Sequence, residues 1–155
     1  MHPSRKLIAL LFCVVLLGFT GTAIANGKST GQTLYVPCYS SVHHGIKTRT
    51  LELTVTLSLH NVDPSKSIRI DAVEYYNTEG KKVRSYIESP IEVGPLGTQE
   101  FIVDQQDTEG GSGANFIVKW KADSPVNAPL AEAVMIGTSS NQGISFLTRG
   151  VVITP

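Results

Sequence analysis

Residues 49–61 hold the most regular alternation of apolar and polar side chains in the chain. The two sets occupy alternate positions: Leu51, Leu53, Val55, Leu57 and Leu59 against Glu52, Thr54, Thr56, Ser58 and His60. Successive side chains of a strand point to opposite faces of a sheet, whereas a helix would distribute these leucines around its circumference. The pattern predicts a strand with one face in the core and the other facing water.

Shorter segments repeat this pattern along the rest of the chain. We predict strands, separated by turn residues, over 33–37, 68–76, 81–87, 99–103, 114–122, 130–138 and 143–153. Pro37 indicates an edge strand, a change of phase near Ala72 indicates a β-bulge, and Asn77–Gly80 indicates a hairpin turn. We expect loops over 137–143 and over the glycine-rich residues 107–114, the latter as a mobile connection.

These elements predict an all-β fold. No long stretch has helical periodicity, and about eight short strands at this spacing are typical of a sandwich or a barrel. The leucine-rich strand and Trp120, which lies on the predicted central strand 114–122, favour two sheets facing each other across one core. We therefore expect an antiparallel two-sheet sandwich of immunoglobulin-like type.

The first 25 residues have the composition of a secretory signal peptide. Arg5 and Lys6 precede the uncharged apolar run 7–19, and Ala23 and Ala25 supply the small residues that a signal peptidase reads. The run is shorter than the roughly 20 residues that span a bilayer. We expect cleavage after Ala25, a single domain over 26–155, export to the periplasm or the external medium, and no remaining membrane span.

Charge then excludes some classes of partner. The chain has 13 basic and 13 acidic side chains, and removal of Arg5 and Lys6 leaves 11 basic side chains, a net charge of −2. Lys119 and Lys121 flank Trp120 at strand spacing and are expected on the solvent face. Because nucleic acid binding needs clustered Lys and Arg, we expect no nucleic acid partner, and anionic membrane surfaces are disfavoured for the same reason.

Cys38 is the only cysteine beyond the predicted signal peptide, so an internal disulfide is excluded. One hypothesis places Cys38 with His43 and His44, and with a distant ligand such as His60, in a zinc or copper site. Another is a homodimer linked through Cys38. The alternative, which we favour, is a buried thiol beside a loop that happens to carry two histidines.

A partner surface is a further hypothesis. Tyr75, Tyr76 and Tyr86 lie near the predicted hairpin, and a tyrosine pair exposed across it would mark a binding face. Ordinary cross-strand packing is the favoured alternative. Arg149 precedes Gly150 at a predicted bulge, from which it would reach an acidic neighbour or a partner.

The ordered segments resemble a family of secreted bacterial proteins known as domain of unknown function 3124. The segments that carry the resemblance are Leu34–Pro37 with Tyr39–Ser40, Leu53–Asn61, Val73–Tyr76, Gly113–Val118 with Trp120, Glu132–Thr138, Gly143–Phe146 and Arg149–Gly150. The resemblance covers about residues 31–153 and implies a secreted single domain, without implying an activity.

The sequence shows no catalytic arrangement. The glycines of 107–114 lead into a strand without a Walker lysine, Ser112 lacks the final glycine of a nucleophile elbow, and the acidic residues form no local pair. We expect a non-enzymatic binding or assembly module of the cell envelope, without a cofactor, whose partner is an unidentified protein or envelope component. The alternative is a periplasmic metal-binding protein using Cys38, His43 and His44; a hydrolase with Ser, His and Asp from distant strands has the least support.

Overall fold

The structure is a computed structural model that describes residues 27–139 and 142–154. The predicted signal peptide therefore lies outside the described residues. These two ranges contain twelve strands and one short 3-10 turn, η1 (Gly111–Gly113), and no α-helix. No helix in them is long and apolar enough to cross a membrane. The all-β expectation is confirmed, although there are twelve strands where eight were predicted.

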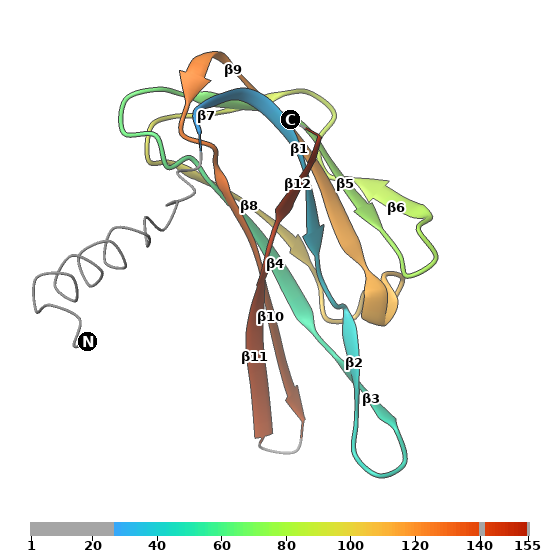
Figure 1. Cartoon of the computed structure of the whole chain (residues 1–155). Coiled ribbons are helices and arrows are strands. Elements are labelled where there is room, and N and C mark those ends of the chain that lie inside the picture. Colours follow the sequence, from blue (N-terminus) through green and yellow to red (C-terminus); the bar gives the residue numbers. More distant parts are fainter. Residues whose placement is uncertain (1–26, 140–141, 155) are drawn as a thin grey trace, which may run out of the picture.

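The strands form three antiparallel sheets (Figure 1). The six-stranded sheet has the order β12-β1-β9-β5-β6, with β7 also paired to β5: β12 (Val151–Thr154), β1 (Ser29–Pro37), β9 (Asn115–Val126), β5 (Ile68–Tyr76), β6 (Lys82–Ser85) and β7 (Ile91–Val93). The four-stranded sheet has the order β11 (Gln142–Arg149), β10 (Leu130–Ser139), β4 (Thr54–His60) and β8 (Thr98–Val103). The third sheet is a hairpin of β2 (Ser41–His44) and β3 (Arg49–Glu52).

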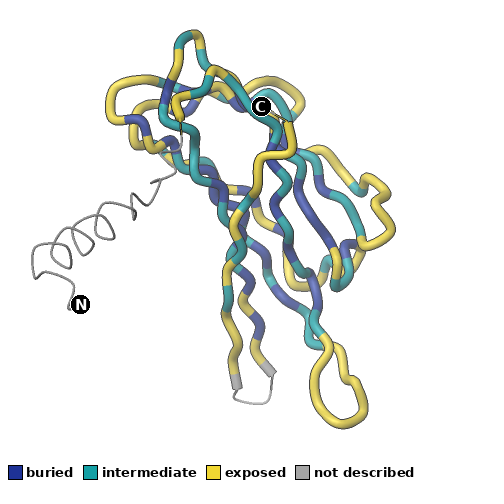
Figure 2. The backbone as a smooth tube through the Cα atoms, viewed as in Figure 1, coloured by how far each residue is buried: buried dark blue, intermediate teal, exposed yellow. Residues whose placement is uncertain are grey.

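Buried side chains of the two larger sheets form one hydrophobic cluster (Figure 2). Strand β9 contributes Phe116, Val118 and Trp120 from alternate positions, and β4 contributes Val55 and Leu57 in the same way. The predicted central position of β9 is confirmed, because β9 pairs with β1 on one side and β5 on the other. Burial of one face of each strand is what the alternating sequence required.

The leucine-rich segment forms two strands rather than one. It is interrupted at Leu53, whose backbone N–H donates to the carbonyl of Ser40 at 2.8 Å. Residues before this point pair within the β2–β3 hairpin, and residues after it join the four-stranded sheet. The alternation continues through Leu53 because the chain stays extended while its pairing partner changes.

Two predicted local features are confirmed. The register of β5 against β9 shifts between Ile70 and Ala72, where the bulge was expected. The turn that links β5 to β6 contains Gly80 at a φ of 74°, and the Asn77 side chain accepts a hydrogen bond from the N–H of Lys81 at 2.9 Å. The partner strand ends at Ser85, two residues before the predicted end, so that Tyr86 lies beyond it.

Three expectations about strand ends are wrong. Strand β1, which ends at Pro37, lies between β12 and β9 rather than at an edge; β12 pairs only with Thr33, Leu34 and Tyr35, so Pro37 lies beyond these pairs. The expected loop over 137–143 is mostly strand, because β10 and β11 continue to positions 139 and 142.

The third wrong expectation concerns Gly150, where a bulge was predicted. The chain instead passes here from the four-stranded to the six-stranded sheet. A Cβ at this position would lie 3.0 Å from a methyl group of Val36 and 3.3 Å from Ala131. The Gly150 N–H donates to the Ala131 carbonyl at 2.9 Å. Glycine fits here because it carries no Cβ between the two sheets.

Two buried polar side chains, Asn61 and Asp63, form a hydrogen-bonded corner just after the C-terminal end of β4. Asn61 donates through its side-chain amide to the carbonyls of Lys66, Val93 and Gly94, at 2.8, 3.1 and 2.9 Å. Asp63 accepts from the backbone N–H groups of Ser65, Lys66 and Asn127, all at 3.0 Å. These bonds lower the pKa of Asp63 to about 2, with the N–H of Asn127 as the largest contribution.

Candidate functional site

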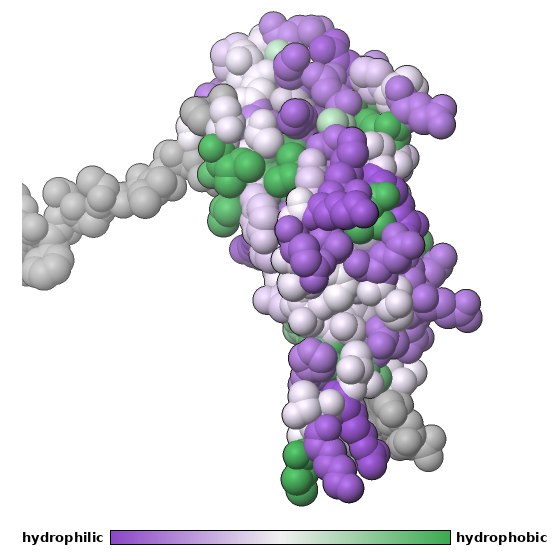
Figure 3. Space-filling model, turned by 90° about the vertical axis from the view of Figure 1, so that its right-hand side faces the viewer, coloured by the Kyte–Doolittle hydropathy of each residue, from purple (hydrophilic) through white to green (hydrophobic). Residues whose placement is uncertain are grey.

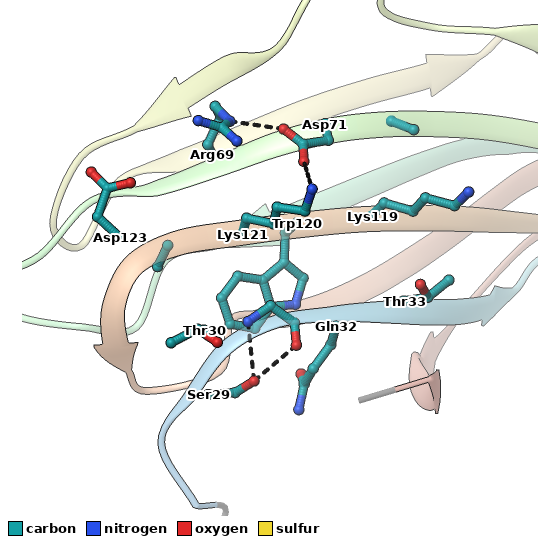
Figure 4. Close-up of a pocket in the computed structure, with 13 residues that line it drawn as sticks. Ser29, Thr30, Gln32, Thr33, Arg69, Asp71, Lys119, Trp120, Lys121 and Asp123 are labelled. Atoms are coloured by element: carbon teal, nitrogen blue, oxygen red, sulfur yellow. Dashed lines mark hydrogen bonds and ion pairs between the residues drawn. The ribbon is translucent and has the colours of Figure 1, made fainter.

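A polar groove of about 720 Å³ lies on the outer face of the six-stranded sheet (Figure 4). Strands β1, β5 and β9 form it, and its charged side chains are Arg69, Asp71, Lys119, Lys121 and Asp123. Both lysines face solvent, as their spacing on either side of Trp120 predicted. The groove combines cations and carboxylates, so its chemistry suits small polar or zwitterionic molecules.

Much of this charge is already neutralised within the groove. Asp71 accepts from Arg69 at 2.8 Å and lies 3.4 Å from the ammonium of Lys121. The hydrogen bond from Arg69 is the main cause that lowers the pKa of Asp71, and the same contact raises the pKa of Arg69. Because these exposed pairs lie in solvent, they contribute little binding energy of their own.

A second hollow, of about 420 Å³, lies where β1 and β12 approach the start of β10. Its walls are mixed: Leu34, Leu130 and Val152 supply apolar surface, and Gln32 and Arg149 supply polar surface. Strand β12 forms the rim: among the described strands it pairs with β1 alone, so its other side is an edge of the sheet as described. We call this hollow the β12 cleft.

The edge strand itself is apolar and exposed. Val151, Val152 and Ile153 have exposed fractions of 57, 48 and 54%. No charged residue lies in β12, whereas β6, at the opposite edge, carries exposed Lys82 and Arg84. Charged side chains on an edge strand discourage pairing with another chain. Strand β12 lacks this protection.

The predicted tyrosine surface is wrong for Tyr75. This side chain is fully buried and packs with its ring centroid 5.0 Å from that of Phe116 and 6.5 Å from that of half-buried Tyr86. Tyr75 lies on the core face of β5, so it cannot contact a partner. Burial raises the pKa of Tyr75 and raises that of Tyr86 to about 12. The Tyr86 hydroxyl donates to the Ile102 carbonyl at 3.1 Å, which connects the segment after β6 to β8.

The glycine-rich connection covers the Tyr75 hydroxyl. A Cβ on Gly110 would lie 1.8 Å from this hydroxyl oxygen, so only glycine fits the present arrangement. The carbonyls of Gly110 and Gly111 accept backbone N–H bonds from Thr78 and Ser40, each at 3.0 Å. These two hydrogen bonds therefore hold the glycine-rich segment 107–114, which was expected to be mobile.

Tyr76 and Arg149 are engaged within the fold. The Tyr76 hydroxyl donates to Glu74 at 3.0 Å, and this contact raises the pKa of Tyr76. Arg149 pairs with Glu132 directly across β10 and β11 at 2.7 Å, with 69% of the arginine side chain exposed. Arg149 was expected to reach either an acidic neighbour or a partner, and the structure shows the acidic neighbour.

The structure does not bring the predicted metal ligands together. Cys38 is buried in the core with 1% exposure, whereas His43 and His44 lie exposed on the β2–β3 hairpin. His60, at the far end of β4, contacts the Thr98 hydroxyl at 2.9 Å. Nowhere in residues 27–139 and 142–154 do three or more His, Cys, Asp or Glu side chains form a group that could hold a metal ion.

Burial also argues against the Cys38-linked homodimer. The thiol lies within the hydrophobic cluster, and burial raises its pKa to about 12. A disulfide between two chains requires both sulfur atoms to be accessible and the attacking one to be a thiolate. The favoured interpretation of Cys38 as a buried thiol is confirmed.

Sequence reasoning missed the groove, the β12 cleft and the Asn61–Asp63 corner. Each joins segments far apart in the sequence, so no single stretch contains its pattern. One local signal was available for the edge: residues 151–153 form an uncharged apolar run. Two further local signals were available for the groove: Arg69 and Asp71 lie two residues apart, as do Lys119 and Lys121, so each pair shares one face of its strand.

These features describe a small antiparallel all-β protein whose surface offers a polar groove and an apolar sheet edge. The family described as protein of unknown function (DUF3124) matches residues 31–153, and the chain belongs to this family. A search of curated proteins finds no match. Among solved structures, the crystal structure of Thermotoga maritima 1070 is similar, with 12% identity and a TM-score of 0.47 over 82% of this chain and 96% of that one.

Proposed function

We propose that this protein is an exported, non-enzymatic binding or assembly module of the cell envelope, with an immunoglobulin-like two-sheet sandwich fold. The signal-like residues 1–25 support export, and the single core shared by the two larger sheets supports the sandwich. The observation that carries the binding role is the apolar edge of β12. Its partner is an unidentified protein or envelope component that supplies an extended segment.

An added strand would find two kinds of contact at this edge. Its backbone would pair with N–H and C=O groups on the side of β12 that no described strand covers, as in other cases of strand addition. Its side chains would extend the two faces of the sheet. Because Val152 lies opposite Leu34 in the register and lines the β12 cleft, side chains on that face would cover the cleft.

The titratable groups with large pKa shifts owe those shifts to the fold. Cys38, Tyr75 and Tyr86 owe their raised pKa values chiefly to burial, and Asp63 owes its lowered pKa to backbone hydrogen bonds. All four shifts move away from neutrality, as burial and backbone hydrogen bonding require.

Site-directed photo-crosslinking in the exporting host tests this proposal. A photoreactive residue would replace Ile153 on β12 or, as a matched control, Ile102 on β8, which is 55% exposed. We expect a discrete crosslinked product in the envelope fraction from position 153 and none of the same mass from position 102. The variant Val152→Lys, which places a charge on the edge, should abolish that product.

Crosslinks of equal yield from both positions would show non-specific contact and contradict the role of β12. Absence of any product from position 153 would contradict it as well. Circular dichroism of Val152→Lys should match that of the unmodified chain, because Val152 is half exposed on an edge strand.

A further inference from the structure

The β2–β3 hairpin projects from the two larger sheets as a finger (Figures 1 and 2). Four residue pairs hold it together, from Ser41 with Glu52 to His44 with Arg49. All residues from His43 to Thr50 are exposed. The turn is compact: Gly45 and Thr48 have φ values of 74° and 47°, and the Thr48 N–H donates to the Gly45 carbonyl at 3.2 Å.

The base of the finger is anchored, so its apex has a defined position. Ser40 is fully buried, and its backbone bonds to Leu53 on one side and to Gly111 on the other. Leu53 is fully buried as well and packs close to Gly137 of β10. The hairpin therefore extends from the core rather than from a long loop.

The apex combines one apolar side chain with cations. Ile46 is completely exposed, and Lys47 and Arg49 follow it, with His43 and His44 on the opposite strand. No acidic residue lies between Ser41 and Leu51. Figure 3 shows a hydrophobic group beside strongly hydrophilic side chains at this lower end of the molecule. The β10–β11 hairpin, which extends in the same direction in Figure 1, carries no charged residue from Ala133 to Thr148.

We propose that this finger docks on an anionic phospholipid surface. Ile46 enters the boundary between headgroups and acyl chains, and Lys47 and Arg49 contact lipid phosphates. Apolar burial together with attraction to anionic lipid is the usual basis of such interfacial binding. The lack of clustered Lys and Arg along the sequence argued against a membrane surface, but Lys47 and Arg49 lie exposed together at one projecting apex.

Shape favours a lipid surface over an acidic protein. A stable protein interface buries about 800 Å² on each partner around a packed apolar centre. The finger itself offers one exposed isoleucine, Ile46, on a two-stranded ribbon. The exposed apolar side chains of Ile136, Ile144 and Leu147 belong to the separate β10–β11 hairpin. A bilayer adapts to a narrow insertion and supplies many phosphates around it.

Vesicle sedimentation tests the proposal on protein recovered from the exporting host, after mass spectrometry has established its first residue. We expect binding to vesicles of phosphatidylglycerol and phosphatidylethanolamine, no binding to phosphatidylcholine alone, and release by salt. The substitutions Lys47→Ser and Arg49→Ser should each lower the partition coefficient about five-fold, as expected for one cation near an anionic surface. Ile46→Ser should lower it by at least as much, and Ile102→Ser, which removes a half-exposed isoleucine on β8, outside the finger, should not change it.

A fluorescent label separates insertion from adsorption. Ile46→Cys can be labelled with an environment-sensitive fluorophore because native Cys38 is buried. We expect a blue shift of the label at position 46 on anionic vesicles and none for the same label at position 102. Equal binding to neutral vesicles, or unchanged binding by the Ile46 and Lys47 variants, would overturn the proposal. Because the finger and β12 share no residue, this outcome would leave the proposed role of β12 unaffected.

Discussion

Asp63 shows how a single carboxylate can make stability depend on pH. Its pKa in the folded chain is about 2, below the ordinary 3.8, so the folded state favours the ionised form. The stabilisation is therefore complete above pH 3.8 and disappears as the pH falls toward 2. Three backbone N–H groups would lose a charged acceptor in this range.

We therefore expect Asp63→Asn to unfold at a lower urea concentration at pH 7 and to depend less on pH between 4 and 2. An amide cannot accept all of these hydrogen bonds, and it does not ionise. Urea unfolding at several pH values measures both effects. The matched control is Asp123→Asn, because Asp123 is exposed; an equal effect of the two substitutions would contradict this role of Asp63.

Cys38 should be almost inert while the chain is folded. Burial raises the pKa of its thiol from 9.0 to about 12, which lowers the thiolate fraction roughly a thousand-fold near neutral pH. We expect a thiol reagent to label Cys38 slowly in buffer and rapidly in concentrated urea. A reductant-sensitive dimer, or equal labelling rates in the two conditions, would show that the thiol is accessible.

At the scale of elements, Gly137 allows β10 to pass the junction of β3 and β4. A Cβ here would lie 2.4 Å from the Cδ2 methyl of Leu53 and 3.0 Å from the carbonyl oxygen of Glu52. We expect Gly137→Ala to destabilise the fold by about 1–3 kcal/mol, the usual cost of overpacking. Leu53→Ala alone should cost about 2–5 kcal/mol because Leu53 is fully buried.

The double variant separates this clash from other effects of the substitutions. Removing the Leu53 methyl groups makes room for the new Cβ, so the two costs should sum to more than the cost of the double variant. Urea unfolding of all four chains measures the coupling. Strict additivity would show that the β10 backbone moves away instead.

The sequence predicted individual strands better than their assembly. Alternation is a local property, which is why the segments of β4 and β9 and the β5 bulge were found, although β9 continues four residues beyond the predicted end, to Val126. Pairing depends on segments far apart: Pro37 suggested an edge, but β12 joins β1 from the other end of the chain. Tyr75 was wrongly expected at a surface for a related reason, since which face of β5 is core depends on a partner sheet formed by distant segments.

At the scale of the whole molecule, the two proposed contacts lie on different parts of the fold. The finger projects from the lower end in Figure 1, whereas β12 pairs with the Thr33–Tyr35 section of β1. A chain held to lipid by its finger would therefore keep the β12 edge free for a partner. This arrangement predicts that the two activities are separable.

We expect Ile46→Ser to lose vesicle binding while position 153 still crosslinks, and Val152→Lys to lose the crosslink while vesicle binding is unchanged. Both substitutions are at exposed or half-exposed positions, so neither should alter the core that fixes the geometry. Measuring both readouts on both variants forms a complete two-by-two comparison. Loss of both activities in either variant would show that lipid and partner use one continuous surface. A contact confined to the finger does not touch β12, so a substitution in the finger should not affect pairing at the β12 edge.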